Sequence, residues 1–146
     1  MSDLFISAQN QTSGRFVILA DEGPAIWMYL TISNGQSIVS DCWIQNLVPT
    51  PDDLSAYREE RNAPPATKAF AHADSHQPSP NPNTVRFEWA PDGDSVALFI
   101  DDILSGFMTS SSKLGFSRNL TTIGPFGSPI DQDQFNSLFN RPSVDA

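Results

Sequence analysis

The sequence predicts an α+β fold that is mainly antiparallel β, with about seven strands in meanders and hairpins and two short helices at about 51–61 and 131–139. Apolar and polar side chains alternate over residues 85–108, which is the period-two pattern of strands with one buried face. Residues that favour helix starts stand at Thr50 and Asp131, directly before the two short segments. We expect the 146 residues to form one domain, because the chain is too short for two cores of ordinary size.

The predicted meander begins at residues 85–89, where Val85, Phe87 and Trp89 share one face. Pro91 and Gly93 favour a four-residue loop at 91–94. That loop sets the three apolar residues opposite another alternating set, Val96, Leu98 and Ile100. A three-residue loop would divide the apolar residues between both faces, so the four-residue loop is preferred.

The last strand of the meander follows a two-residue turn at Asp101 and Asp102. A regular strand after this turn places Ile103 and Phe107 on the same face as the first apolar set. The opposite face then carries three large apolar residues, Phe99, Leu104 and Met108. These residues need cover from another element or from a partner, and the helix at 131–139 is the expected cover within the chain.

Further strands are predicted before the meander, at 4–7, 15–20, 25–32 and 37–44. The last two flank Asn34 and Gly35, and Asn-Gly between apolar runs is a strong hairpin signal. A two-residue turn at this point pairs Thr31 with Ile38 and Trp27 with Cys42. Both faces of the hairpin are apolar, so we expect it to be covered on both sides, with Cys42 as a small buried side chain.

The two helices and the loop at 63–83 complete the predicted fold. Thr50 and Pro51 suit the first positions of the helix at 51–61, and Asp131 with Gln134 forms a capping-box pattern before the second. The loop at 63–83 contains five of the twelve prolines, so we expect it to run over the surface of the domain.

Composition narrows the function classes. The net charge is −9, and eight Lys and Arg residues are scattered along the chain, so direct binding of nucleic acid is not expected. An acidic protein of this kind suits a partner with a basic surface. One cysteine excludes an internal disulfide, and the apolar stretches are too short to span a membrane. With no signal peptide visible at the N-terminus, a cytoplasmic location is expected.

Candidate chemistry is sparse. His72, Asp74 and His76 would project to one side of a strand, so they could converge on a metal ion. The competing interpretation is a solvated polar stretch next to the proline-rich loop. No phosphate-binding glycine loop and no nucleophile elbow occurs, and no cofactor is predicted. Cys42 beside His72 or His76 is a formal catalytic pair, but a thiol in an apolar strand is normally inert.

The main hypothesis is therefore a non-enzymatic binding protein that recognises another protein, as an inhibitor, an immunity-type protein or an assembly adaptor. Its candidate contact residues are two aromatic residues in glycine-flanked loops and the uncovered face of the meander: Phe116, Phe126, Phe99, Leu104 and Met108. The same face could instead form a homodimer. The alternatives are a small metal-dependent hydrolase and a module that binds a small ligand between the sheet and residues 124–129.

Overall fold

The computed structural model describes residues 4–57 and 63–141, which contain two stacked, mainly antiparallel sheets and one α-helix. Sheet 1 has the order β1-β2-β3-β4, formed by β1 (Phe5–Gln9), β2 (Arg15–Asp21), β3 (Ala25–Ser33) and β4 (Ile38–Asn46). Sheet 2 has the order β5-β6-β7-β8-β9, formed by β5 (Val85–Trp89), β6 (Ser95–Ile100), β7 (Ile103–Thr109), β8 (Phe116–Ser117) and β9 (Ser128–Pro129). The α+β class is confirmed, with nine strands where about seven were predicted.

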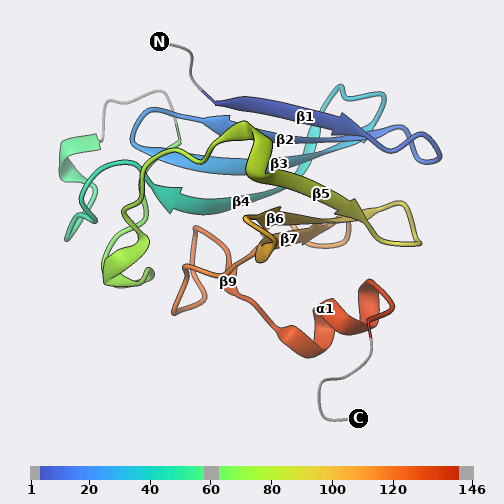
Figure 1. The fold of residues 1–146 in the computed structure, drawn as a ribbon. Coiled ribbons are helices and arrows are strands. Elements are labelled where there is room, and N and C mark those ends of the chain that lie inside the picture. The colour runs from blue at the N-terminus through green and yellow to red at the C-terminus, as the bar shows by residue number, and fades with distance from the viewer. Residues whose placement is uncertain (1–3, 58–62, 142–146) are drawn as a thin grey trace.

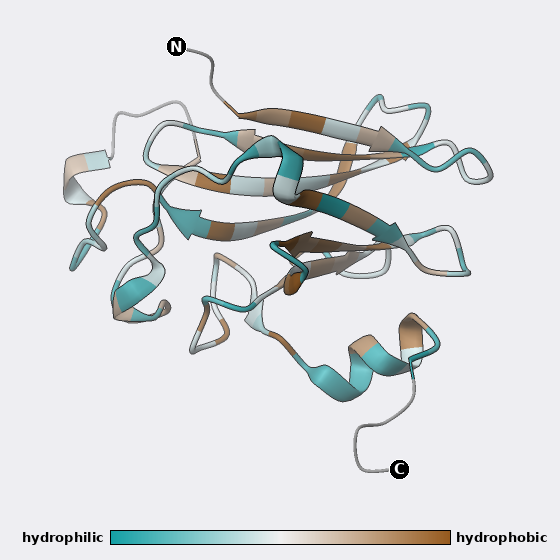
Figure 2. Ribbon diagram, viewed as in Figure 1, coloured by the Kyte–Doolittle hydropathy of each residue, from teal (hydrophilic) through white to brown (hydrophobic). Residues whose placement is uncertain are grey.

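The molecule has three layers, and the helix α1 (Gln132–Leu138) forms the third against the outer face of sheet 2 (Figure 1). Asp131 caps this helix, because its side chain accepts a hydrogen bond from the Gln134 backbone N–H at 3.1 Å. The predicted helix at 131–139 and its cap are therefore confirmed. Figure 2 shows why the strands are interior, since β6 and β7 are strongly hydrophobic while much of α1 is hydrophilic.

The inner core lies between the two sheets. Its fully buried side chains come from alternate positions of both sheets, and they include Val17, Leu19, Met28, Leu30, Cys42, Val96, Leu98 and Met108. Burying each large aliphatic side chain contributes about 1.5–3 kcal/mol. The β5–β6 register is the predicted one, with Val85 opposite Ile100 and Trp89 opposite Val96.

The predicted face of β7 is wrong from Gly106 onward. A β-bulge between Leu98 and Phe99 leaves Ser105 as an extra residue in β7, so every later side chain changes face. Phe107 consequently lies on the outer face, and Met108 points into the inner core. The turn before the bulge is as predicted, because Asp101 and Asp102 both have positive φ, at 54° and 63°.

The predicted position of the β3–β4 hairpin is confirmed, but most of its predicted residue pairs are wrong. Thr31 pairs with Ile38 as predicted, but a register shift between Leu30 and Thr31 then sets Trp27 opposite Trp43 and Cys42 opposite Met28. Trp27 and Trp43 thus share the outer face of sheet 1, while Cys42 is fully buried in the inner core as expected. Both faces of the hairpin are covered, one by sheet 2 and the other by loops.

The predicted helix at 51–61 is wrong over the part that the structure describes. Only a short 3-10 helix forms, at Ser55–Tyr57, and residues 58–62 lie outside the described residues. Thr50 does not cap a helix, because its hydroxyl bonds Asn46 Nδ2 at 3.3 Å and Ser75 Oγ at 3.1 Å. The competition between these side-chain bonds and a helix cap decides the local structure.

The proline-rich segment 63–83 lacks strands and contains the 3-10 helices Ala73–Ser75 and Pro82–Thr84. It is not merely a surface loop. Ala66 and Ala71 are buried on the outer face of sheet 1, next to Phe126 and Leu120 from a later segment. Together the segments 63–71 and 118–127 form the loop cover of sheet 1.

Candidate functional site

The outer face of sheet 2 is built from aromatic side chains. Phe99 of β6 and Phe107 of β7 pack against Phe135 of α1, with ring centroids 6.3 Å and 5.6 Å apart. Phe139 stacks on Phe135 at 4.8 Å and meets Phe107 edge-on at 6.2 Å. Such aromatic pairs add about 0.5–1.5 kcal/mol each beyond the buried area. This aromatic cluster fixes α1 on the sheet, and we refer to α1 and its rings as the helix cover.

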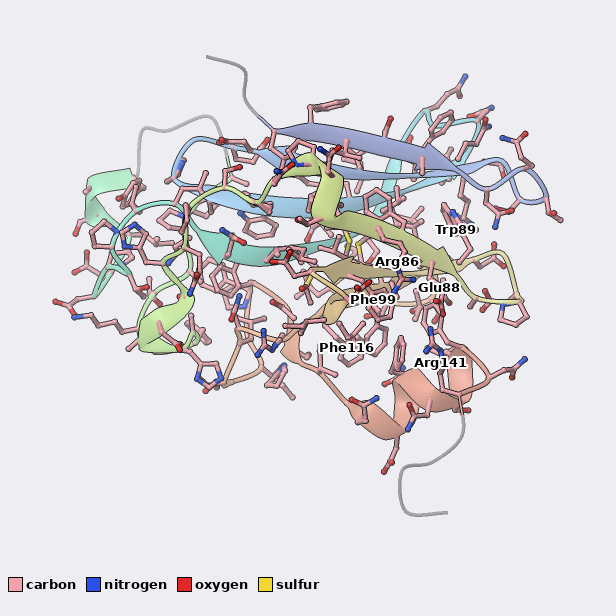
Figure 3. All side chains as sticks on the ribbon, viewed as in Figure 1. Arg86, Glu88, Trp89, Phe99, Phe116 and Arg141 are labelled. Atoms are coloured by element: carbon pink, nitrogen blue, oxygen red, sulfur yellow. The ribbon has the colours of Figure 1, made fainter. Side chains whose placement is uncertain are left out.

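Charged residues close one edge of the helix cover. Arg141, just beyond α1, donates to both carboxylate oxygens of Glu88 on β5, at 2.6 and 2.5 Å. The Arg86 guanidinium lies 4.3 Å from the centroid of the Phe99 ring, a distance at which cation–π attraction operates. Figure 3 shows Arg86, Glu88 and Arg141 gathered between β5 and the end of α1. This edge is therefore closed by charge pairing.

The opposite edge of the helix cover opens into an apolar hollow of about 570 Å³. We define the apolar hollow by its lining residues, Phe116, Thr121, Thr122, Ile123, Ser128, Pro129 and Asp131. Phe116 forms one wall, and its ring is stacked on Phe107 with centroids 4.4 Å apart and planes inclined by 11°. Ile123 forms another wall and is 75% exposed, the largest value among the exposed large hydrophobic residues.

The connector 124–129 positions Ile123 at this hollow. Phe126 is only 2% exposed, and its ring centroid lies 5.6 Å from that of Phe70 in the loop cover and 6.2 Å from that of Trp27 on β3. Gly124 and Gly127 bridge to each other through backbone hydrogen bonds of 3.0 and 3.2 Å. Phe126 thus anchors the connector 124–129 in the interior. Ile123, directly before the connector, is left exposed to solvent.

The structure separates the predicted contact residues into two groups. Phe116 and Leu104 are partly exposed at the rim of the helix cover, where they remain accessible. Phe99, Phe126 and Met108 are 7%, 2% and 0% exposed, so they support the core and cannot contact a partner in this conformation. Sequence reasoning missed Ile123, although an isoleucine directly before Gly-Pro in a polar loop is an available signal.

The structure does not bring the predicted metal ligands together. His72, Asp74 and His76 lie on and around the 3-10 helix Ala73–Ser75, all exposed, and not on a strand whose alternate side chains share a side. Within residues 4–57 and 63–141, no group of three or more His, Cys, Asp or Glu side chains is placed to hold a metal ion. Elemental analysis of the purified protein tests the metal-dependent alternative directly.

The Cys42 thiol and the two histidines lie in different environments. Cys42 is fully buried in the inner core, whereas His72 and His76 are exposed. Burial raises the pKa of the Cys42 thiol well above its ordinary value, and the Asp41 charge adds to the rise. The thiol therefore stays protonated at neutral pH, which is the state of an inert core cysteine.

One half-buried acid stands out on the outer face of sheet 1. Burial raises the pKa of Asp41, which lies opposite Tyr29 in the β3–β4 ladder. The pKa of Tyr29 is also raised, first by burial and then by Glu22, whose Oε2 accepts from the tyrosine hydroxyl at 3.1 Å. The tyrosine is thus a neutral hydrogen-bond donor at physiological pH and not a general base.

A second, polar hollow lies at the other end of β8, where sequence reasoning predicted nothing. It runs between the end of β4, the segment 77–80 and the β6–β7 turn, and Arg118 and Asn119 also line it. Its volume is about 320 Å³. The lining residues are up to 75 positions apart in sequence, such as Ile44 and Asn119, which explains why no local motif announces this hollow.

Comparison of the chain with protein-family models, with curated proteins and with solved structures gives no match. Along residues 4–57 and 63–141, no helix has the length and apolar character needed to cross a membrane.

Proposed function

We propose that the protein is a non-enzymatic binding protein that recognises another protein through the apolar hollow. The observation that carries this proposal is the 75% exposure of Ile123 beside the half-covered ring of Phe116. A large aliphatic side chain held in solvent by a fixed loop gains most from burial in a partner, at about 25 cal/mol per Å² of apolar surface. Aromatic and aliphatic anchors in hollows of this kind carry most of the binding energy of protein interfaces.

The charge around the apolar hollow favours a partner with a basic surface. Asp131 lines the hollow, and Asp133 follows it in the first turn of α1, with both residues exposed. The chain as a whole carries a net charge of −9. Complementary charge accelerates association and selects partners, while the apolar contact supplies affinity. The proposed epitope is therefore a Lys- or Arg-rich segment that presents one large apolar side chain.

The position of the hollow also supports recognition. It lies next to the helix cover, and the wall residue Phe116 is held in a defined orientation by its stacking on Phe107 of β7. A rigid site loses less conformational entropy on binding than a mobile one, so affinity is gained without new contacts. The seven residues that line the hollow are fewer than the roughly 20–30 residues that each partner contributes to a full interface, so the surrounding rim must contribute as well.

Selection from a random peptide display library tests the proposal without knowledge of the partner. We expect enriched peptides to combine basic residues with one Leu, Ile or Phe, and to bind the purified protein saturably. Ile123→Ser should weaken binding about tenfold, because burial of one large aliphatic side chain contributes about 1.5 kcal/mol or more. Ile38→Ser is the matched control, because Ile38 is 54% exposed at the start of β4 and does not line this hollow.

Self-association is the competing outcome, and size-exclusion chromatography with light scattering separates it from partner recognition. A dimer at micromolar concentration that Ile123→Ser dissociates and Ile38→Ser leaves intact would assign the hollow to a second copy of the chain. Failure to enrich any peptide, or equal weakening by the two serine variants, would overturn the proposal.

A further inference from the structure

The polar hollow is one part of a larger polar region. An adjoining hollow of about 350 Å³ has three lining residues in common with the polar hollow, Gln77, Arg118 and Asn119. The first hollow also contains Asp101, and the second also contains His72 and Asp74. Volumes of this size lie at the lower end of those that hold small molecules, about 300–1,000 Å³.

Buried hydrogen bonds hold the walls of the polar hollow in place. The Gln45 side chain is 6% exposed and donates from Nε2 to the carbonyls of Gln77 at 3.2 Å and Pro78 at 3.0 Å. The Asn119 side chain donates to the Ile44 carbonyl at 2.9 Å, and the Arg118 backbone N–H donates to Ser105 at 3.0 Å. Four separate segments are thereby fixed around one space: the end of β4, residues 77–78, residues 118–119 and Ser105 of β7. This is the arrangement of a preformed site.

Arg118 and Asp101, which line the polar hollow, form no ion pair with any residue that the structure describes. Three of the described arginines, Arg15, Arg86 and Arg141, form ion pairs with carboxylates. Arg118 forms none within 4.0 Å among the described residues, even though Asp101 lines the same hollow. A guanidinium and a carboxylate that face one space without meeting can each bind the opposite charge of a third molecule.

We propose that the polar hollow binds a small zwitterion of the amino-acid class, with its carboxylate on Arg118 and its ammonium group on Asp101. The charges of the polar hollow and the adjoining hollow, taken together, support this class over a simple anion. Arg118 lines both hollows and supplies one positive charge, while Asp101 in the first and Asp74 in the second supply two negative charges, so an anion alone would meet net repulsion. A cation alone would leave Arg118 without a partner.

The uncharged part of the ligand has a surface to lie on. Ile100, Ile103 and Pro78 line the same hollow as Arg118, and Ile103 is 46% exposed. These side chains add apolar surface to the lining that contains Arg118 and Asp101. A short aliphatic chain that joins the carboxylate to the ammonium group therefore matches the lining, whereas a large polar body does not.

Chemical-shift titration of the isotope-labelled protein tests the proposal with γ-aminobutyrate as the probe. Butyrate and butylamine serve as its single-charge halves, and α-aminobutyrate is an isomer that carries both charges at one end. We expect saturable shifts in the Gln45, Asp101 and Asn119 amides with γ-aminobutyrate or α-aminobutyrate, with a Kd on the order of 1 mM. The tighter isomer reports the separation of the two charges, and each half-molecule should bind at least tenfold more weakly.

Two pairs of variants assign the contacts. Arg118→Gln and Asp101→Asn should each weaken zwitterion binding about tenfold, the loss expected for one charge-assisted hydrogen bond. Lys113→Gln and Asp102→Asn are the matched controls, because they change the net charge equally and do not line the hollow. Asn also suits the positive φ of the turn that contains both aspartates, so neither variant strains it.

Three results would overturn the proposal. They are the absence of saturable shifts with both isomers, equal binding of butyrate or butylamine, and equal weakening by the control variants. Ile123→Ser should leave the titration unchanged. The experiments therefore test ligand binding at the polar hollow and partner binding at the apolar hollow independently.

Discussion

The two sheets are covered on their outer faces by different kinds of structure. The loop cover of sheet 1 is held by buried hydrogen bonds that centre on Asn46, which is fully buried. Its Oδ1 accepts from Trp43 Nε1 and from the Ala66 backbone N–H, both at 2.9 Å, and its Nδ2 donates to the Ala66 carbonyl at 3.0 Å. Trp27 Nε1 donates to the Pro64 carbonyl at 2.9 Å and adds a second attachment.

Among the residues that the structure describes, the helix cover of sheet 2 has no comparable buried polar bond. It is held by the packed rings of Phe107, Phe135 and Phe139, and at the solvent edge by the pairing of Arg141 with Glu88. Polar bonds have defined partners and directions, so they fix Trp43 and Ala66 in place around Asn46. Apolar packing has no such requirement, and it leaves partly covered side chains such as Phe116 at its rim. The apolar hollow lies where this rim meets Ile123, an exposed residue of the segment 118–127.

Of the three predictions that test this comparison, replacement of Asn46 should have the largest effect on stability. Asn46→Ala removes the partner of three buried groups, and each unsatisfied group costs about 1–3 kcal/mol. We expect the free energy of unfolding to fall by about 4 kcal/mol, as measured by urea denaturation followed through tryptophan fluorescence.

A matched asparagine tests whether this loss is specific to the loop cover. Asn136→Ala, in α1, changes the same side chain at a partly exposed position and should shift stability by less than about 0.5 kcal/mol. If Asn46→Ala were as mild as Asn136→Ala, the loop cover would be held by its apolar contacts, and the contrast between the two covers would disappear.

The sequence predicts those parts of the fold in which side-chain period and turn chemistry agree. The β5–β6 register follows from alternation and from the loop at Pro91 and Gly93, and the α1 cap follows from Asp131. Prediction fails where an extra residue enters a strand, as at Ser105. Gly106 is the local signal, because a Cβ at that position would lie 2.8 Å from the Phe116 carbonyl and 2.9 Å from Ile44. A glycine within a strand commonly marks a bulge or a close approach.

The candidate sites are less accessible to sequence reasoning. Phe116 is predicted as a candidate because it lies in a glycine-flanked segment, but the exposure of Ile123 depends on the tertiary packing of the following residues, in which Phe126 is buried against the outer face of sheet 1. The polar hollow requires Gln45, Gln77 and Arg118 to meet across three segments. No period or motif records such long-range placement, so tertiary structure is needed to find either site.

Asp41 provides a second, smaller test of the loop-covered side. Because burial raises its pKa from 3.8, the folded state holds the proton more tightly than the unfolded chain does. Ionisation therefore destabilises the fold: stability falls as pH rises from the unfolded value through the folded value, and the penalty persists at neutral pH. Asp41→Asn should raise the thermal midpoint at pH 7 and flatten this acid-range dependence.

Comparison with Asp52→Asn controls for the general effect of removing one negative charge, because Asp52 is an exposed carboxylate with Lys68 3.1 Å away. An Asp41→Asn variant that is less stable than the wild type at pH 7 would mean that the carboxylate has a favourable partner in solution. Asp41 would then resemble Glu88, whose carboxylate is paired with Arg141, and its ionisation would not destabilise the fold.

The Arg141–Glu88 pair should have the smallest effect of the three. The two side chains are 40% and 29% exposed, so water and salt screen the attraction despite its two-oxygen geometry. A double-mutant cycle with Arg141→Gln and Glu88→Gln should give a coupling of about 0.5 kcal/mol that declines in 1 M salt. Lys68→Gln with Asp52→Asn, at a more exposed pair, should give a coupling near zero. A coupling that persisted in high salt and exceeded about 2 kcal/mol would make this ion pair, and not the aromatic cluster, the main attachment of α1, because desolvated pairs alone reach that strength.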